Sequence, residues 1–456
     1  MALPPGPRAP AAVNTARLLR RPLETLLEWN RRYGDAFTVR WMVFGTGVYV
    51  ADPEEIKGMF TGDQSGLLAG EANSPLSPVL GRNSVLVLDG PEHLRQRKLL
   101  LPPFQGSAVS AFREVIRDVA AAEIGRWSVS DEFPIRERMR ALTFEVICRA
   151  VFGVTEPERV ERLRAALLAV IDTGAIFFAP SFIRVNLGRL SPWGRFQRRL
   201  ATADALIYEE IARRRRAADL EERTDVLSLL LRARDEDGNA MTDAELRDEL
   251  FTMLAAGHET TATGLAFAFD LIPRHPDVQA RLRDDPDDGD YLDAVVTETL
   301  RIRPVLDAAE RTLAVPRTVC GYDLPAGIRV YPAIACVHHR EDLYPEPERF
   351  LPERFLEGKA TSYTWLPFGG GIRRCIGASL AQAEMAEVIR VVLDRVDLVA
   401  ARPDPERVAL KGITLAPWHD AEVRAVSRRG AAQPARDSRS PIASPTPSGA
   451  MMQTSR

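Results

Sequence analysis

The chain has few cysteines for its length, and none is placed as a disulfide scaffold or a zinc site requires. Its 456 residues include only Cys148, Cys320, Cys336 and Cys375, with no C-x-x-C pair among them. Disulfide frameworks and structural zinc sites both need cysteines in pairs at short spacings. This composition predicts a reducing, cytoplasmic compartment.

Three further absences exclude other classes of protein. No apolar run approaches the roughly 20 residues of a membrane span, and residues 1–8 lack the apolar core of a signal peptide. A net charge of −3 and an aromatic content of 7% provide neither a basic surface nor a stacking platform for nucleic acid. No G-x-G-x-x-G sequence follows a predicted strand, so we expect no flavin or nicotinamide domain. A soluble protein with no nucleic-acid partner and no membrane span is expected.

Apolar residues recur at helical spacing over long segments, whereas strand patterns are short. The long helices are predicted over residues 108–126, 136–153, 157–173, 195–216 and 243–272. Asp52 and Pro53 predict a further helix up to about Phe60, because an N-cap acceptor precedes a proline at the first helical position. Strands are expected only at Phe37–Arg40, at Gly47–Ala51 and within 312–332. The fold class is mainly α with a minor β region.

No Gly/Ser linker or sharp change of composition divides residues 20–427, so one large domain is predicted there. Residues 1–19 form a Pro/Ala-rich N-terminal segment. Residues 428–456 are rich in Ser, Pro, Arg and Ala and have too few large apolar side chains to bury. We expect this last segment to be a disordered tail.

The most specific segment surrounds Cys375, where the chain reads F-G-G-G-I-R-R-C-I-G. A thiolate is a preferred ligand of haem iron, and nearby backbone N–H groups and cations lower the pKa of a thiol. A lone cysteine is more often a small buried apolar residue. Here, however, every fixed position of F-x-x-G-x-R-x-C-x-G is filled, by Phe368, Gly371, Arg373, Cys375 and Gly377. The segment resembles the cysteine loop of the cytochrome P450 monooxygenases.

This resemblance implies a triangular, mainly α-helical single domain around a buried haem b, with Cys375 as the ligand of the iron. Three successive glycines, 369–371, would let the backbone approach the flat macrocycle closely and reach positive φ. Phe368 would shield the sulfur from water.

Residues 256–261 read A-G-H-E-T-T in the middle of the predicted helix 243–272. Gly257 costs about 1 kcal/mol relative to alanine there, and a threonine hydroxyl can bond the carbonyl one turn back, so the segment can open a local groove. A solvated helix face is the alternative interpretation, but apolar residues surround the segment. In the family that the chain resembles, an acid followed by an alcohol supplies protons to bound dioxygen. Glu259 and Thr260 occupy those two positions.

Glu298 and Arg301 are one turn apart on a predicted helix, a spacing common in surface ion pairs worth about 0.2–0.5 kcal/mol. The later segment 350–355, F-L-P-E-R-F, resembles the family segment whose arginine joins such a pair. The resemblance therefore implies a buried triad of Glu298, Arg301 and Arg354 that supports the cysteine loop.

Haem carries two propionate carboxylates, which favour cations and hydrogen-bond donors on one side of the macrocycle. His93 and Arg97 lie i, i+4 on one predicted helix face and match the family's His-x-x-x-Arg clamp. Arg373 is the further partner that the resemblance implies, and Arg311 is a fourth candidate. Because the chain has 60 lysines and arginines, an ordinary solvated face is the alternative.

The resemblance implies a monooxygenase that activates dioxygen reductively and inserts one oxygen atom into an apolar small molecule. A fatty acid, a terpenoid, a steroid and a polyketide-like compound all fit. Electrons would come from a separate ferredoxin or flavodoxin with its reductase, docking at Arg95, Lys98 and Arg374.

The family's substrate-contact segments assign a set of pocket residues in this chain. They are Phe177, Phe178, Phe251, Ala256, Val305, Leu306, Asp307, Ile413 and Leu415. Asp307 either anchors a polar substrate group or points into solvent.

Two other functions fit the same fold. A peroxide-dependent or isomerase-type haem-thiolate enzyme would need neither the acid–alcohol pair nor an electron donor, and Glu259 and Thr260 argue against it. A catalytically silent ligand-binding or sensor protein would usually carry an output module, and only the predicted tail follows the domain.

Overall fold

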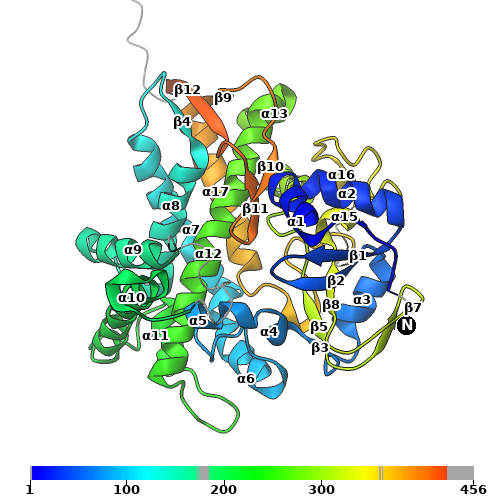
Figure 1. Ribbon diagram of the computed structural model, residues 1–456. Coiled ribbons are helices and arrows are strands. Elements are labelled where there is room, and N and C mark those ends of the chain that lie inside the picture. Colours follow the sequence, from blue (N-terminus) through cyan, green and yellow to red (C-terminus); the bar gives the residue numbers. More distant parts are fainter. Residues whose placement is uncertain (1–2, 172, 174–183, 359–360, 362, 429–456) are drawn as a thin grey trace, which may run out of the picture.

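The computed structural model describes residues 3–171, 173, 184–358, 361 and 363–428. A long helix, α12 (Asp243–Leu271), runs through the middle of the molecule, with α7 to α11 on one side and the largest sheet on the other (Figure 1). A capping box starts α12. Thr242 Oγ1 accepts from the Glu245 N–H at 3.2 Å, and Glu245 Oε2 accepts from the Thr242 N–H at 2.7 Å.

The other predicted long helices are present within a few residues of their expected bounds. They are α7 (Ser107–Gly125), α8 (Ile135–Phe152), α9 (Pro157–Ile171) and α10 (Pro192–Arg215). The helix predicted from Pro53 is α3 (Pro53–Thr61), where the Asp52 side chain accepts from the Glu55 N–H at 2.8 Å. Further helices are α1 (Ala11–Arg20), α2 (Pro22–Tyr33), α4 (Ala69–Ala72), α5 (Ser77–Leu80), α6 (Gly90–Leu100), α11 (Val226–Arg232), α13 (Pro276–Asp284), α14 (Gly289–Ile302), α15 (Ile334–His338), α16 (Arg354–Glu357) and α17 (Ala378–Arg395).

The largest sheet has five strands in the order β1-β2-β8-β5-β3. These are β1 (Ala36–Trp41), β2 (Gly45–Val50), β8 (Arg329–Pro332), β5 (Arg311–Leu313) and β3 (Leu67–Leu68). Strands β2 and β8 pair in parallel, so that Tyr49 lies opposite Tyr331 and their rings stack with centroids 4.7 Å apart. A Cβ on Gly47 would come within 2.3 Å of the Tyr331 ring, so this position needs glycine.

The prediction that strands are confined to three places is wrong. A second sheet, β4-β12-β9, joins β4 (Glu132–Pro134), β12 (Glu422–Arg428) and β9 (Val396–Ala400), and a hairpin pairs β10 (Val408–Lys411) with β11 (Thr414–Pro417). A small hairpin of β6 (Arg317–Val319) and β7 (Tyr322–Leu324) lies within the expected region. Strand β12 has the alternating burial of a strand with one face in the core, a pattern that the sequence prediction missed. Val423 and Ala425 are buried, and the residues beside them are more exposed.

The N-terminal segment packs on the domain rather than standing apart from it. The Thr38 hydroxyl donates to Pro4 O at 2.7 Å, and Leu18 on α1 is buried in the core around β1 and β2. The predicted boundary at residue 19 therefore does not divide the fold. The predicted tail begins at Arg428, the last residue of β12, and its remainder lies outside the described residues.

The largest buried cluster is formed by α7, α8, α10, α12, α14 and α17. Within the described ranges, no helix combines the length and the apolar character needed to cross a membrane. This cluster surrounds the middle of α12 and the start of α17, close to several of the predicted site residues.

Candidate active site

Cys375 lies three residues before α17, at the end of a tight loop. Its backbone N–H donates to Phe368 O at 2.9 Å, and the Arg374 N–H donates to Gly371 O at 3.1 Å. These bonds close the loop on itself, and the side chain of Cys375 is exposed rather than packed. The sulfur is therefore presented for binding, which a buried apolar cysteine would not be.

Two of the three loop glycines have the positive φ that was expected, and two of them pack closely on a neighbouring helix. Gly369 and Gly371 have φ of +64° and +62°. A Cβ on Gly371 would lie 1.9 Å from Phe60 O, and one on Gly370 would lie 2.4 Å from the Phe60 ring. The close approach at these two positions is therefore to α3. Gly369 has no other atom near its Cβ position, so only backbone conformation requires glycine there.

The electrostatics of Cys375 depend on a balance between burial and positive charge. Although a water molecule can reach the side chain, protein surrounds the loop closely, and burial raises the pKa of the Cys375 thiol. The Gly377 N–H, Arg374 and Arg97 act in the opposite direction and lower that pKa. A metal ion bound to sulfur would complete the stabilisation of the thiolate, because coordination deprotonates a thiol. The donor set thus fits a haem iron.

The proposed propionate residues gather into one positively charged cluster. Burial, followed by Arg373, Arg97 and Arg311, lowers the pKa of His93 to about 3. Burial also lowers the pKa of Arg311 and of Arg373 to about 10, and each is further lowered by another arginine of the cluster. Arg373 pairs with Asp89, so one carboxylate partly offsets three guanidinium groups.

Two buried nitrogens of this cluster have no hydrogen-bond partner among the described residues. They are His93 Nδ1 and Arg311 Nε. Arg311 Nε is a donor, and so is His93 Nδ1 in the tautomer that carries its hydrogen there, so both need an acceptor. A group with two carboxylates would supply both the acceptors and the missing negative charge, so the cluster fits haem propionates.

The middle of α12 has the local geometry that the sequence predicted. Thr260 Oγ1 donates to Ala256 O at 2.6 Å, and Ala256 is exposed although it lies in the middle of a buried helix. Gly257 serves packing, because a Cβ there would meet Ile147 Cδ1 of α8 at 2.6 Å. Thr260 and Ala256 therefore share an accessible face, one turn apart.

Glu259 is turned toward α8 and does not share the face of Thr260. Its carboxylate forms ion pairs with Arg136 and with Arg140 Nε, the latter at 2.8 Å. Neighbouring helix residues point about 100° apart, which accounts for the different directions. No local pattern indicated either arginine as a partner of Glu259, because they lie more than 100 residues earlier in the chain, although both fall on the helix predicted over 136–153.

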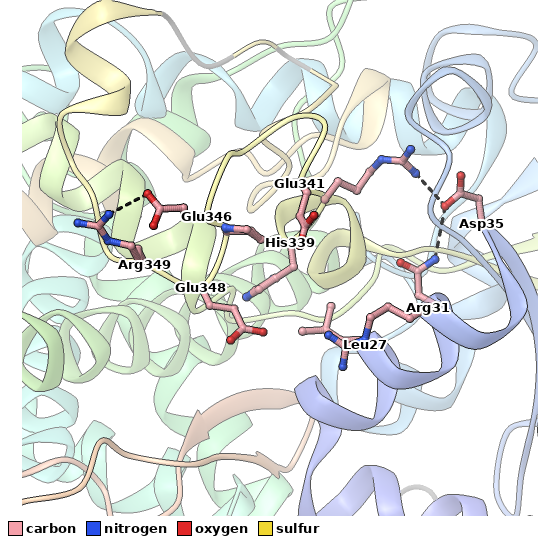
Figure 2. A pocket seen from close by; sticks show the side chains of 11 residues that line it. Leu27, Arg31, Asp35, His339, Glu341, Glu346, Glu348 and Arg349 are labelled. Atoms are coloured by element: carbon pink, nitrogen blue, oxygen red, sulfur yellow. Dashed lines mark hydrogen bonds and ion pairs between the residues drawn. The ribbon is translucent and has the colours of Figure 1, made fainter.

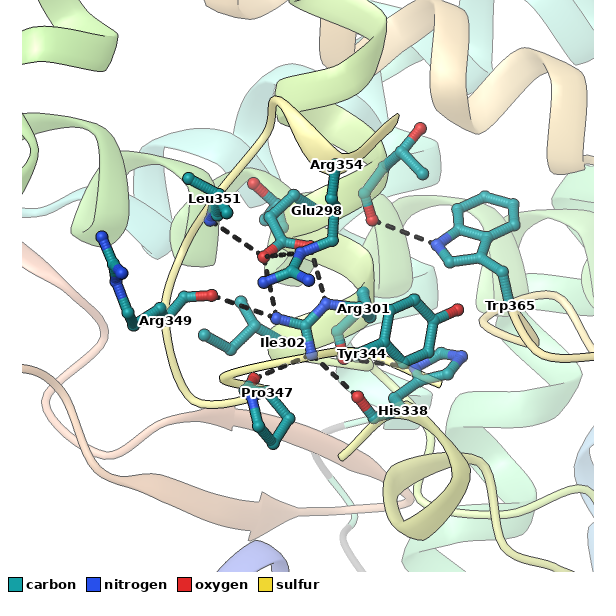
Figure 3. Close-up of polar contacts among 12 residues, drawn as sticks. Glu298, Arg301, Ile302, His338, Tyr344, Pro347, Arg349, Leu351, Arg354 and Trp365 are labelled. Atoms are coloured by element: carbon teal, nitrogen blue, oxygen red, sulfur yellow. Dashed lines mark hydrogen bonds and ion pairs between the residues drawn. The ribbon is translucent and has the colours of Figure 1, made fainter. Parts of the chain in front are cut away.

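Glu298, Arg301 and Arg354 meet in one buried network (Figure 3). Arg301 Nε and Nη2 donate to the two Glu298 oxygens at 2.6 and 2.8 Å, and Arg354 Nε donates to Glu298 Oε1 at 3.2 Å. Neither Glu298 nor Arg301 has any exposed surface. The remaining Arg301 donors bind the carbonyls of His338, Pro347 and Arg349.

This network continues to the cysteine loop. His338 Nε2 accepts from the Leu366 N–H at 2.7 Å, and the Tyr344 hydroxyl donates to Thr364 O at 3.0 Å. Because residues 364–366 directly precede the loop, its N-terminal end is fixed to the Glu298–Arg301 pair.

The predicted pocket residues fall into distinct groups. Phe177 and Phe178 lie outside the described residues. Phe251 and Leu415 are fully buried in the core, with Arg247 stacked 4.9 Å from the Phe251 ring, so neither faces a cavity. Ala256 and Ile413 are exposed, Leu306 is half-buried and Val305 is nearly buried.

Asp307 adopts neither of the two arrangements that were considered for it. It is half-buried, and its Oδ2 accepts from the Tyr49 hydroxyl at 3.2 Å. Burial raises the pKa of Asp307, while the bond from Tyr49 lowers it. Asp307 therefore ties the segment before β5 to strand β2.

A cavity of about 660 Å³ lies away from the cysteine loop, between α2 and the segment 339–349 (Figure 2). Charged side chains dominate its wall, among them Arg31, Asp35, Glu341 and Glu348. None of the predicted site residues lines it. An apolar substrate would leave those charges without partners, so this cavity is not the substrate pocket.

Comparison with known proteins gives the same assignment over nearly the whole chain. The cytochrome P450 family model matches residues 4–417. "Putative cytochrome P450 135B1" of Mycobacterium bovis is 43% identical over 441 residues, which cover 94% of this chain and 92% of the relative. "Putative cytochrome P450 135A1" of Mycobacterium tuberculosis is 38% identical over 432 residues, covering 94% and 96%.

Two solved structures share the fold at low sequence identity. Retinoic acid bound cyanobacterial CYP120A1 has a TM-score of 0.80 at 24% identity, covering 93% of this chain and 99% of that one. The heme domain of cytochrome P450DA has a TM-score of 0.82 at 22% identity, covering 93% and 97%.

The fold and these comparisons together define the class of protein, a haem-thiolate protein. The chain belongs to the cytochrome P450 family, the haem-thiolate monooxygenases, and its cofactor is haem b.

We predict that Gly371→Ala disrupts haem binding far more than Gly369→Ala. Both positions have positive φ, which costs a non-glycine residue roughly 1–2 kcal/mol, but only the methyl group at 371 would collide with the backbone of Phe60. The haem content of the two purified variants, from the ratio of Soret to protein absorbance, is the measurement. Equal haem content would show that the contact with α3 does not position the loop.

Proposed function

We propose that this protein is a monooxygenase that inserts one atom of dioxygen into an apolar small molecule, using electrons from a separate protein. The observation that carries this proposal is the exposed thiol of Cys375 beside a buried, under-neutralised cluster of cations. When bound, haem supplies the reductive activation of dioxygen. The protein's contribution is to hold the cofactor, exclude water and control protons.

Four residues are assigned to holding the cofactor by its carboxylates: His93, Arg97, Arg311 and Arg373. Arg97 has a second function, because its Nη2 donates to Arg374 O at 2.7 Å and so ties α6 to the cysteine loop. Cys375 is assigned as the iron ligand. Phe368 is half-buried and packs edge-on against Trp365, with centroids 5.8 Å apart, which places an apolar side chain on the loop.

Proton delivery is assigned to Thr260 and Glu259. A hydroxyl has one hydrogen to donate and two lone pairs to accept, so Thr260 can pass a proton on only when its O–H turns from Ala256 O toward another acceptor. Glu259 can take part only after its carboxylate leaves Arg136 or Arg140. The accessible face around Ala256 and the half-buried Leu306 supports an apolar substrate.

We expect Thr260→Ala to raise the hydrogen peroxide released per electron pair consumed, because protons then reach reduced dioxygen without control. General acid–base groups typically contribute about 10²–10⁴-fold, so a several-fold shift is measurable. Peroxide and NADPH are assayed with a ferredoxin and its reductase, and ¹⁸O₂ reports incorporation of oxygen into product. Thr252→Ala, which removes a buried hydroxyl two turns earlier on α12, serves as the control. Unchanged coupling in Thr260→Ala would refute the role of Thr260, and product formed only with added peroxide would indicate a peroxide-dependent enzyme.

The electron donor is proposed to be an acidic ferredoxin or flavodoxin that docks near Arg374. This guanidinium is exposed and forms no ion pair or hydrogen bond with the described residues. The expected patch is smaller than predicted, because Arg95 already pairs with Asp235 and Glu245, and Lys98 pairs with Glu236. Arg374 therefore remains as the exposed cation of the expected patch, whereas Arg97 is assigned to the cofactor.

We predict that Arg374→Gln raises the KM for the donor protein and weakens the dependence of KM on salt, because long-range attraction accelerates association. Turnover is measured over a range of NaCl concentrations. Arg198→Gln is the matched control, since Arg198 is also exposed but lies on α10. If both variants keep the KM and salt dependence of the parent, the docking surface lies elsewhere.

A further inference from the structure

His258, next to Glu259 on α12, has a fixed ring orientation. The side chain is buried, and Nδ1 lies 2.6 Å from Leu254 O, so this nitrogen carries hydrogen and donates to the carbonyl. Phe144 packs edge-on against the ring at 5.5 Å, and the Thr143 hydroxyl donates to His258 O at 2.9 Å. The hydrogen bond to Leu254 O and the packing of Phe144 leave the ring little freedom, and the Thr143 bond fixes the backbone beneath it.

The second ring nitrogen, Nε2, is buried and has no hydrogen-bond partner among the described residues. It lies 3.9 Å from Glu259 Oε2. With Nδ1 protonated, Nε2 carries a lone pair, so two acceptors face each other across this gap. They can form a hydrogen bond only if a proton sits between them. Buried polar atoms seldom lack a hydrogen-bond partner, and a catalytic role is one explanation when they do.

Charges from three elements surround this pair. Arg136 and Arg140 of α8 contact Glu259, while Asp420, which follows β11, and Lys411 of β10 extend the network. Burial, and then Arg140 and Arg136, lower the pKa of His258, whereas Leu254 O and Glu259 raise it. The neutral ring is therefore the form present beside an ion-paired Glu259 at neutral pH.

Arg136 can release Glu259 without being left unpaired. Its Nη1 donates to Asp420 Oδ1 at 2.8 Å and its Nε donates to Thr263 Oγ1 at 3.3 Å. A buried guanidinium without a partner would be strongly unfavourable. Because these two partners remain, the ion pair of Arg136 with Oε1 can open at a modest cost. Arg140 must also release Oε2, the oxygen that faces His258, before Glu259 can pass a proton to the ring.

We propose that His258 Nε2 and the Glu259 carboxylate together store one proton beside Thr260. A proton from water binds the released carboxylate. The O–H bond then breaks as an N–H bond forms at Nε2, which leaves an imidazolium and a carboxylate, and the reverse transfer returns the proton to Glu259. A side-chain movement of about 1 Å closes the gap to hydrogen-bond distance. This assignment rests on the proposed function of Glu259 and makes His258 a positioning residue.

Two variants separate proton storage from a structural role. In His258→Gln the side-chain amide can still donate to Glu259, and in His258→Asn it can still donate to Leu254 O, but neither amide titrates. His275→Gln is the matched control, because His275 Nδ1 lies 2.8 Å from Leu271 O, the same one-turn contact, at the C-terminal end of α12. The carbon monoxide spectrum and the Tm of each holoprotein confirm folding.

For coupling, both His258 variants should release several-fold more peroxide per NADPH, an effect smaller than the roughly 10²–10⁴-fold that a group acting directly as acid or base supplies. In the parent, coupling should improve as the pH falls below about 6.5, because burial and the two arginines lower the pKa of His258 from that value, and both variants should lose this improvement. Recovery of parental coupling and pH dependence in His258→Gln would overturn the proposal, as would an equal loss in His275→Gln.

A spectroscopic measurement tests whether His258 and Glu259 share a proton, and it does not require catalytic turnover. The chain has six histidines, so ¹⁵N-histidine labelling of the ferrous carbon monoxide complex, with assignment by His258→Gln, resolves the ring. We expect the Nδ1–H tautomer at pH 7.5, and Glu259→Gln should reduce the proton affinity of Nε2 by at least about tenfold, one pKa unit. A midpoint unchanged by Glu259→Gln would overturn the store.

The two experiments also distinguish the store from the function on which it rests. If Thr260→Ala uncouples the enzyme but Glu259→Gln leaves the titration midpoint of His258 unchanged, proton storage is refuted and the monooxygenase assignment stands. If no oxygenated product forms with any donor while the two groups titrate together, the store stands and the assignment fails.

Discussion

The ion pair between Glu298 and Arg301 has no exposed surface, and two buried charges are stable only when other groups surround them. Here the Arg301 donors bind Glu298 and three backbone carbonyls, while Glu298 also accepts from the Leu351 N–H at 2.9 Å. Removing one partner of such a pair typically costs about 3–5 kcal/mol. The segment 338–351 is therefore held firmly against α14, and through His338 it holds the start of the cysteine loop.

From that fixed point the loop needs two more constraints. Glycines at 370 and 371 allow it to pack directly on Phe60 of α3, and the bond from Arg97 to Arg374 O attaches it to α6. Helix α6 also carries His93, a member of the cluster that is assigned to the two haem carboxylates. The positions of the thiol and of the cations are thus linked, because α6 carries cations of the cluster and also binds the cysteine loop. Haem binding would relieve the repulsion among Arg97, Arg311 and Arg373 and so tighten the assembly.

Local patterns predicted the parts of this site that lie on one helix. The Glu298–Arg301 contact follows from i, i+3 spacing, and the bond from Thr260 to Ala256 O follows from i, i+4 spacing. Motif order along the chain placed Cys375, His93 and Arg373 at one site. Contacts between distant segments were not accessible in this way. Arg136 reaches Glu259 across 123 positions and Tyr49 reaches Asp307 across 258, and nothing in the local sequence marks either partner. Phe251 was assigned to the pocket because it lies in a segment that contacts substrate in the family, but it is buried in the core, since such a segment does not specify which of its side chains face the substrate.

The account depends most on Cys375 binding the iron as a thiolate. The direct measurement is the absorption difference between the dithionite-reduced protein with and without carbon monoxide, for the parent and for Cys375→Ser. We expect a strongly red-shifted Soret band in the parent and its loss in the variant. A band at the position typical of a neutral ligand in the parent, or a red-shifted band that survives in Cys375→Ser, would contradict the account.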